Sequence, residues 1–246
     1  MPEKESQSTD ILGIKPVAQA ISVATQAVVD GASAFLGRIC LPVAEEFGLL
    51  LQDKVRGWRA RNAVVVVSEA QVRYDKYQLG RQACHAHPRL VAAVLEHGSW
   101  SDDKSLQEMW GGLLASSCSP DGRDESNLIF IHILSQLTGL QVNVMAYACE
   151  NVAKDVSPAG LIIPVSELHV DLPTIKTIAR TEDIHRLDRE LDHLRGLGLI
   201  RGGFTEFEPT VDITPSPLAL NLYVRCQGFT GSPVDFFGLT PAAEKA

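Results

Sequence analysis

The chain has 246 residues, of which 45% are hydrophobic, and this is enough for one large folded domain or two smaller ones. Its net charge of −8 argues against a general electrostatic attraction to nucleic acid or anionic lipid, although a local basic face is compatible with an acidic total. The five scattered cysteines lack CxxC spacing, and residues 1–10 lack the basic and apolar regions of a secretory signal, so we expect a cytoplasmic protein.

Residues 1–12 are predicted to be a flexible tail, followed by a helical domain over residues 13–152. This domain opens at Pro16 with an Ala- and Val-rich helix whose small side chains allow close helix contacts, so we expect a homo-oligomer. The uncharged run 16–29 is shorter than the roughly 20 apolar residues of a spanning helix. We therefore expect no transmembrane span, and a peripheral membrane contact through residues 16–51 is an alternative.

A second predicted helix covers residues 41–61, and the segment after it favours a continuing helix, with a short strand at its four consecutive valines as the alternative. Four cations lie close together near position 58: Lys54, Arg56, Arg59 and Arg61. Such a cluster can contact phosphate or nucleic acid, but only Trp58 is interleaved with it, and cations also complement a helix C-terminus. We expect a solvated face, with nucleic acid as the alternative.

Cys84, His85 and His87 are of the residue types that bind zinc. No second pair of ligands follows at a convincing spacing, and Pro88 is typical of the start of a helix, which Gly98 should end. We expect no metal and no other cofactor.

Residues 99–118 have the most clearly specified local structure of the chain. Ser101 is predicted to be the N-cap of a helix, and Asp102 and Asp103 place negative charge at its positive end. Four large apolar residues then follow at helical intervals and are predicted to form one buried face: Leu106, Trp110, Leu113 and Leu114. These residues specify a structural core rather than a reaction.

Residues 127–137 are apolar almost all round, which predicts a central core helix. His132 within it is expected to be a hydrogen-bonded core residue rather than a catalytic base. Another helix is predicted from Leu140 to Asn151.

The composition changes near residue 153, where prolines begin to separate shorter segments. Two helices, a Gly-Leu-Ile exit, a short β-ribbon and a closing helix then follow in the order of a winged helix, so residues 153–228 are predicted to form a winged-helix-like subdomain, with a C-terminal tail over 229–246. The expected fold class is mainly α, with an N-terminal helical bundle and a C-terminal winged-helix-like α+β subdomain.

The charge of the second of these helices bears on DNA binding. It carries Arg186, Arg189 and Arg195, but five acidic residues lie between positions 182 and 192, and the expected wing is acidic too. These carboxylates would face or flank phosphate unfavourably, so we favour a protein contact over DNA for this subdomain.

Several segments together resemble the Abi-alpha family of bacterial proteins, named for abortive infection: the small-residue helix, PVAEEFGLLLQDKVRGWRARN, SLQEMWGGLLASS, FIHILSQLTGLQVNVM and the GLGLI ending. The most specific element is the E-x-W-x-x-L-L-A-S run from Glu108 to Ser116. The resemblance implies anti-phage defence, in which an infected cell stops growing or dies before phage progeny mature. The family pattern consists of packing residues, so it implies no catalytic positions.

The sequence also lacks a Gly-rich phosphate loop, an HExxH motif, a nucleophile elbow and a deaminase signature, so no enzyme is expected. We expect a defence protein that acts through protein contacts and self-association on an unknown phage or host trigger. The alternatives are a nucleic-acid-binding regulator and a membrane-directed effector.

Overall fold

The structure is a computed structural model that describes residues 15–40, 43, 54–78, 84–205 and 209–240, without the side chains of residues 15–26, 54–56 and 78. The fold is mainly α, as predicted. Its helices are α1 (Lys15–Ile39), α3 (Lys54–Gln78), α4 (Pro88–Gly98), α5 (Lys104–Ser116), α6 (Leu128–Leu134), α7 (Gly139–Asn151), α8 (Leu172–Ala179), α9 (Ile184–Gly196), α10 (Pro217–Cys226) and α11 (Pro233–Phe236). Short strands join in antiparallel pairs: β1 (His85–Ala86) with β2 (Cys118–Ser119), β3 (Lys154–Val156) with β4 (Ile162–Pro164), and β5 (His169–Asp171) with β6 (Thr210–Asp212).

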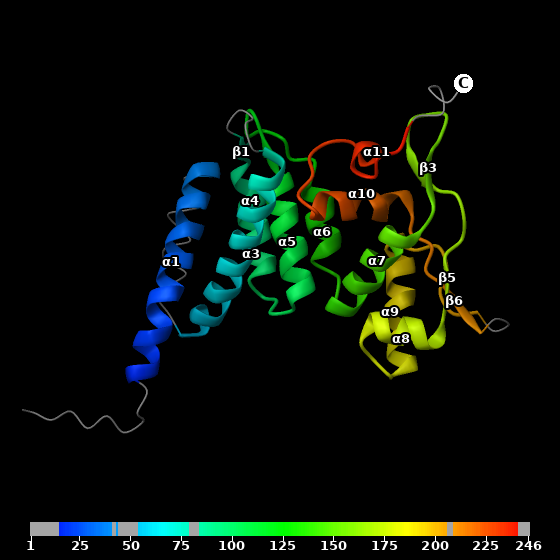
Figure 1. Ribbon diagram of the computed structural model, residues 1–246, viewed down its shortest axis with the longest axis horizontal. Coiled ribbons are helices and arrows are strands. Elements are labelled where there is room, and N and C mark those ends of the chain that lie inside the picture. Colours follow the sequence, from blue (N-terminus) through cyan, green and yellow to red (C-terminus); the bar gives the residue numbers. More distant parts are fainter. Residues whose placement is uncertain (1–14, 41–42, 44–53, 79–83, 206–208, 241–246) are drawn as a thin grey trace, which may run out of the picture.

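The helices follow one another across the molecule roughly in chain order, from α1 at one edge to α8 and α9 towards the other (Figure 1). The exception is α10, which returns across the molecule and packs on α5 and α7. The buried apolar residues before and after position 152 form one continuous core, because α7 packs against α8 and α9, and α10 packs back on α5 and α7. No helix in the described part of the chain has the length and hydropathy needed to cross a bilayer.

The four consecutive valines lie inside α3, so the continuing helix is confirmed and the short strand is not formed. Val64, Val66 and Val67 are buried, whereas Val65 is 41% exposed. Burial of three of the four side chains compensates for the weak helix preference of β-branched residues.

The helix predicted at Ser101 begins later. Asp103 is the N-cap of α5, because its Oδ1 accepts the backbone N–H of Leu106 at 3.0 Å. Ser101 acts one step earlier, where its hydroxyl accepts the backbone N–H of Asp103 at 3.3 Å. Both side chains are good caps, and the fold uses Ser101 to shape the turn that precedes the helix.

The predicted central core helix is a short helix, α6, with only one side in the core. Ile129 is 56% exposed and His132 is exposed, so the expectation of a core histidine is wrong. The apolar pattern could not show this, because a helix that is apolar all round carries no information on which side faces the core.

The C-terminal region carries the elements expected after residue 153, with α8, α9 and α10 close to their predicted positions. Strand β5 precedes α8 and pairs with β6, and Val211 of β6 also bridges Phe204. The tip of the expected wing, residues 206–208, lies outside the described residues, and the winged-helix arrangement stays a prediction. The segment predicted as a C-terminal tail contains α11, and the rings of Phe236 at its end and of Phe237, which follows, pack against Tyr223 of α10.

The centre of the fold depends on two adjacent glycines of α5. A Cβ atom on Gly111 would lie 2.9 Å from the carbonyl oxygen of Val66 in α3, and one on Gly112 would overlap the backbone carbonyl of Cys226 in α10. Since adjacent helical residues point about 100° apart, the two glycines allow close backbone approach to two different helices. Trp110, before them, is 2% exposed, and Leu113 and Leu114, after them, are fully buried.

We predict that Gly112→Ala lowers the free energy of unfolding by at least about 2 kcal/mol, because the added methyl group meets backbone rather than a movable side chain. Urea denaturation followed by circular dichroism measures this. The matched control is Gly37→Ala in α1, where nothing lies within 4 Å of the new Cβ, and which should raise stability by about 0.5–1 kcal/mol. Equal effects of the two substitutions would contradict this account of the α5 contact.

Candidate functional site

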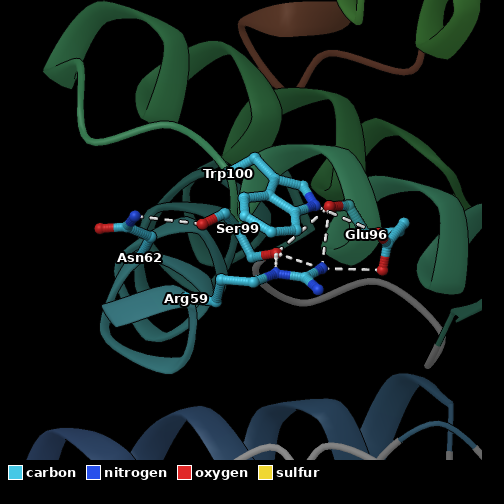
Figure 2. Close-up of polar contacts among 5 residues, drawn as sticks. All are labelled: Arg59, Asn62, Glu96, Ser99 and Trp100. Carbon is cyan, nitrogen blue, oxygen red and sulfur yellow. Dashed lines mark hydrogen bonds and ion pairs between the residues drawn. The ribbon is translucent and has the colours of Figure 1, made fainter. Parts of the chain in front are cut away.

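Arg59, from the predicted basic run, is held in place on α3 by the end of α4 and the turn that follows it (Figure 2). Its Nη2 donates to Oε2 of Glu96 at 2.7 Å, and its Nε donates to the hydroxyl of Ser99 at 3.0 Å. Its guanidinium carbon lies 4.2 Å from the ring centroid of Trp100. With 16% of its side chain exposed, Arg59 acts as a clamp between two helices.

The same contacts fix Glu96 and Trp100. The indole N–H of Trp100 donates to Oε1 of Glu96 at 3.2 Å, so one carboxylate receives hydrogen bonds from both residues. The hydrogen bond from Arg59 is the largest cause that lowers the pKa of Glu96 below its ordinary value, and the bond from Trp100 adds to it. Trp100 is 56% exposed, yet its orientation is fixed.

Two buried amides hold the backbone of the same turn. Asn62 of α3 donates to the carbonyl oxygen of Ser99 at 3.1 Å, and Gln107 of α5 donates to that of Ser101 at 2.9 Å. Among the described side chains, no buried nitrogen or oxygen lacks a hydrogen-bond partner. The turn at residues 99–101 is therefore a rigid part of the molecule.

Of the other three cations of the predicted run, the structure describes the side chain of Arg61. Arg61 is exposed, two residues further along α3. Lys54 and Arg56 also belong to α3, but their side chains lie outside the described residues. Arg59 itself is already paired with the carboxylate of Glu96, which neutralises the charge of its guanidinium group.

A groove of about 270 Å³ opens beside Trp100. Its floor consists of buried core side chains, Leu106, Trp110, Leu134 and Leu137. Its rim consists of more accessible residues, His97, Trp100, Ser101 and Ser135. The imidazole of His97 stacks on Trp110, with ring centroids 6.0 Å apart and planes inclined by 13°. The groove thus combines an apolar floor with a rim that is polar and aromatic.

A second, more polar cleft of about 190 Å³ lies where α3, α5, α7 and α10 meet. Arg73 in this cleft pairs with Glu69 and lies 4.0 Å from Glu108. Tyr223 donates its hydroxyl to Glu150 at 2.6 Å, and burial together with this bond raises the pKa of Tyr223. The charged groups of the cleft are therefore paired with one another.

Sequence reasoning did not single out either cavity. The groove takes residues from α4, α5 and α6, and the cleft takes residues as distant as Arg73 and Gln227. Such sets leave no local pattern, because only the tertiary fold brings their members together. The one available signal was the turn around Trp100, where Ser99 and Asp103 flank an aromatic residue.

The possible zinc ligands have different surroundings. Cys84 lies just before β1 and is buried, whereas His85, the first residue of β1, is exposed. His87 caps α4, because its Nδ1 accepts the backbone N–H of Arg89 at 3.2 Å. In the described ranges, no group of three or more His, Cys, Asp or Glu side chains is arranged to hold a metal ion.

Two of the three arginines of α9 lie beside carboxylates of the same helix. Nε of Arg186 is 3.6 Å from Glu190, and Nη2 of Arg195 is 2.5 Å from Asp192. Glu190 also accepts a hydrogen bond from the hydroxyl of Thr138 at 2.9 Å, which links α9 to the start of α7. Much of the positive charge of this helix is therefore balanced locally.

Residues 67–213 match the family model described as abortive infection alpha. The match begins within α3 and ends just after β6, so it covers more than half of the chain and includes the groove residues and the double glycine. Searches of curated proteins and of solved structures found no match.

We predict that Arg59→Ala lowers the free energy of unfolding by about 1–2 kcal/mol, because it removes hydrogen bonds and a cation–π contact from a largely buried site. Arg61→Ala, two positions away and exposed, should change it by less than about 0.5 kcal/mol. Thermal or urea denaturation of the two variants measures the difference. If both arginines proved equally dispensable, the clamp would have no role in stability.

The lowered pKa of Glu96 predicts a pH dependence. Its ionised form is stabilised in the folded state, so its contribution is complete above the pKa of the unfolded chain and is lost as the pH falls through the lower folded value. The difference in unfolding free energy between wild type and Glu96→Gln should therefore shrink as the pH is lowered from 7 to about 3, which lies below the ordinary Glu pKa of about 4.3. Urea denaturation at both pH values measures it, and a constant difference would speak against the lowered pKa.

Proposed function

Because the chain belongs to the abortive infection alpha family, we propose that it acts in bacterial defence against phage, through protein contacts and self-association and without a catalytic step of its own. The family match over residues 67–213 is the observation that carries the defence role. In such a role, an infected cell stops growing or dies before phage progeny mature.

The pairing of charged groups supports contact rather than catalysis. In the polar cleft, Arg73 pairs with Glu69, and Tyr223 pairs with Glu150. The Tyr223–Glu150 bond joins α10 to α7, whereas Arg73 and Glu69 pair within α3. A catalytic acid, base or nucleophile acts through a group directed at substrate, whereas these groups are directed at one another.

The state of the arginines favours a protein partner over nucleic acid. Phosphate binding needs cations that are free to replace counterions. Arg59 is engaged by Glu96, and Arg195 lies beside Asp192. Binding to another protein does not require unpaired cations, because the cores of protein interfaces contain few charged residues.

Self-association is proposed to use the α1 and α3 layer at the edge of the molecule (Figure 1). Val65 and Val72 are two helical turns apart on α3 and are 41% and 66% exposed. Val28 of α1 is 48% exposed. Burying these side chains against a second copy would remove apolar surface from water on both chains.

We predict that the wild-type chain forms an oligomer at micromolar concentration and protects a susceptible bacterium from phage. Val65→Lys together with Val72→Lys should yield a monomer and reduce protection by about tenfold or more, because burying two ammonium groups in an apolar interface is costly. Light scattering measures the mass, and plaque counts measure protection.

The matched control is Leu161→Lys together with Val165→Lys. These side chains are 65% and 56% exposed and directly precede and follow β4, away from the α1 and α3 layer, so the control adds the same charge elsewhere. It should keep both the oligomer and the protection. A monomeric wild type that protects would refute self-association, and a wild type that gives no protection would refute the defence role.

The same samples distinguish the alternatives. Binding to duplex DNA or RNA that weakens steeply with salt would point to a nucleic-acid regulator, and flotation with liposomes would point to a membrane effector. A charge-reversal test of the basic run should change Arg61 and leave Arg59 in place. Reversal at Arg59 would oppose Glu96 with a second negative charge and would confuse loss of folding with loss of binding.

A further inference from the structure

We propose that His193 forms a pH-sensitive contact between α9 and α7, which holds the two helices together while the imidazole is neutral and weakens when it takes up a proton. The two helices pack against each other (Figure 1). This inference goes beyond the proposed function and does not depend on it. It is carried by the hydrogen bonds of the Gln141 side chain, which leave only one role to the imidazole nitrogen that faces it.

The amide of Gln141 has a fixed orientation. Its Oε1 accepts the backbone N–H of Thr138 at 3.0 Å, as part of the capping box of α7. Its Nε2 donates to the backbone carbonyl oxygen of Glu190 in α9 at 3.0 Å. A backbone N–H can only donate a hydrogen bond and a carbonyl oxygen can only accept one, so turning the amide over would lose both bonds. Two independent contacts therefore assign the nitrogen and the oxygen of this amide.

The fixed amide determines the state of His193. Nε2 of Gln141 lies 2.8 Å from Nδ1 of the imidazole. Because the amide nitrogen can only donate, Nδ1 must accept, which requires a neutral ring with its proton on Nε2. A proton on Nδ1 would place two donors 2.8 Å apart. The hydrogen bond to Gln141 is therefore incompatible with the charged form of His193.

Loss of this bond has a cost because Gln141 is only 1% exposed. If the protonated ring turns to solvent, one N–H of the buried amide loses its acceptor. Two further bonds to Glu190 remain, one from the Gln141 amide and one from the Thr138 hydroxyl, which donates to Oε2 at 2.9 Å. The apolar side of α9 also stays in the core through Leu187, Leu191 and Leu194. Protonation therefore loosens the joint between α7 and α9 without unfolding the helix.

The helices packed on α9 present no charged group that replaces Gln141 as the partner of His193. These helices are α7 and α8, whose charged residues are Glu150 and Lys176. Glu150 is nine residues from Gln141, about 13 Å along the helix. Lys176 is paired with Glu182 at 3.0 Å. Across the joint, the imidazole therefore faces a neutral amide donor.

The charges on α9 itself nearly balance around the ring. Glu190, one turn before His193, is the carboxylate placed to favour a charged ring. Its oxygens are already engaged, since Oε2 accepts from Thr138 and Oε1 lies 3.6 Å from Nε of Arg186. The other charged residues within one turn of the histidine are Arg189, Asp192 and Arg195, of which the last two pair with each other. The amide of Gln141 therefore decides which form of the ring the closed joint holds.

The direction of the pH dependence follows from this assignment. Imidazole side chains commonly change charge between pH 5 and 8. In the closed joint the ring is held neutral, whereas in the opened joint it is free to bind a proton. Because the open state binds more protons, the joint is strongest near pH 8 and loses this contribution as the pH falls towards 5.

The test is hydrogen exchange of the full chain, followed by mass spectrometry at pH 8 and pH 5.5 and corrected for the intrinsic pH dependence of amide exchange. The opening constant of the α9 amides should rise about fivefold at the lower pH, which corresponds to the loss of one hydrogen bond. In His193→Asn the rise should be absent, because the asparagine Oδ1 accepts the same bond and does not titrate. Equal rises in wild type and in His193→Asn, or no rise in wild type, would overturn the proposal.

The matched control is His185→Asn, which replaces an exposed histidine on the same helix and should keep the wild-type response. Thermal unfolding at pH 8 verifies that both variants fold. Nitrogen-15 NMR of the imidazole rings tests the assignment directly, and His193 should be neutral at pH 8 with its proton on Nε2. A proton on Nδ1 at pH 8, or loss of the pH response in His185→Asn, would also contradict the proposal.

Discussion

The close backbone approach of α5 to α3 and α10 is the constraint on which the rest of the structure depends. Gly111 and Gly112 have no Cβ to separate the helices, so the carbonyl groups of Val66 and Cys226 lie against α5 from two directions. Side chains on either side of the pair, such as Trp110 and Leu113, then reach core positions that a wider helix spacing would leave unfilled. The cost is the conformational entropy of two glycines within a helix, which the buried contacts offset.

The position of α5 also determines the turn before it. Gln107 of α5 and Asn62 of α3 hold the backbone at residues 99–101 from two sides, and Arg59 adds a side-chain clamp. A turn fixed in this way can hold Trp100 at the surface in one orientation. The contact that packs the core therefore also shapes the groove, so a substitution in the glycine pair would be expected to disturb both.

Much of the helical framework was predictable because its signals are local. Three correct predictions depend only on neighbours within one or two helical turns. They are the apolar stripe from Leu106 to Leu114, the proline at the start of α4 and the continuation of the helix through the four valines of α3. The N-cap of α5 is Asp103 rather than the predicted Ser101. Both side chains are suited to cap a helix, so the contacts of the turn with the rest of the fold decide between them. The exposed side of α6 and the two cavities could not be predicted from the sequence, because they depend on which distant helices pack together. His132 shows this most directly, since an identical local sequence would suit a buried helix.

The basic run shows how the same residues change meaning once the fold is known. Arg59 and Arg61 are equivalent in the sequence, being cations two positions apart on one helix. A separation of two residues rotates the side chain by about 200°, so one arginine turns towards α4 and the other towards solvent. Arg59 thereby becomes part of the support for Trp100, and its charge is taken up by Glu96. A cluster that suggested phosphate contact thus contributes instead to a rigid aromatic surface, because Arg59 supports Trp100 and forms an ion pair with Glu96.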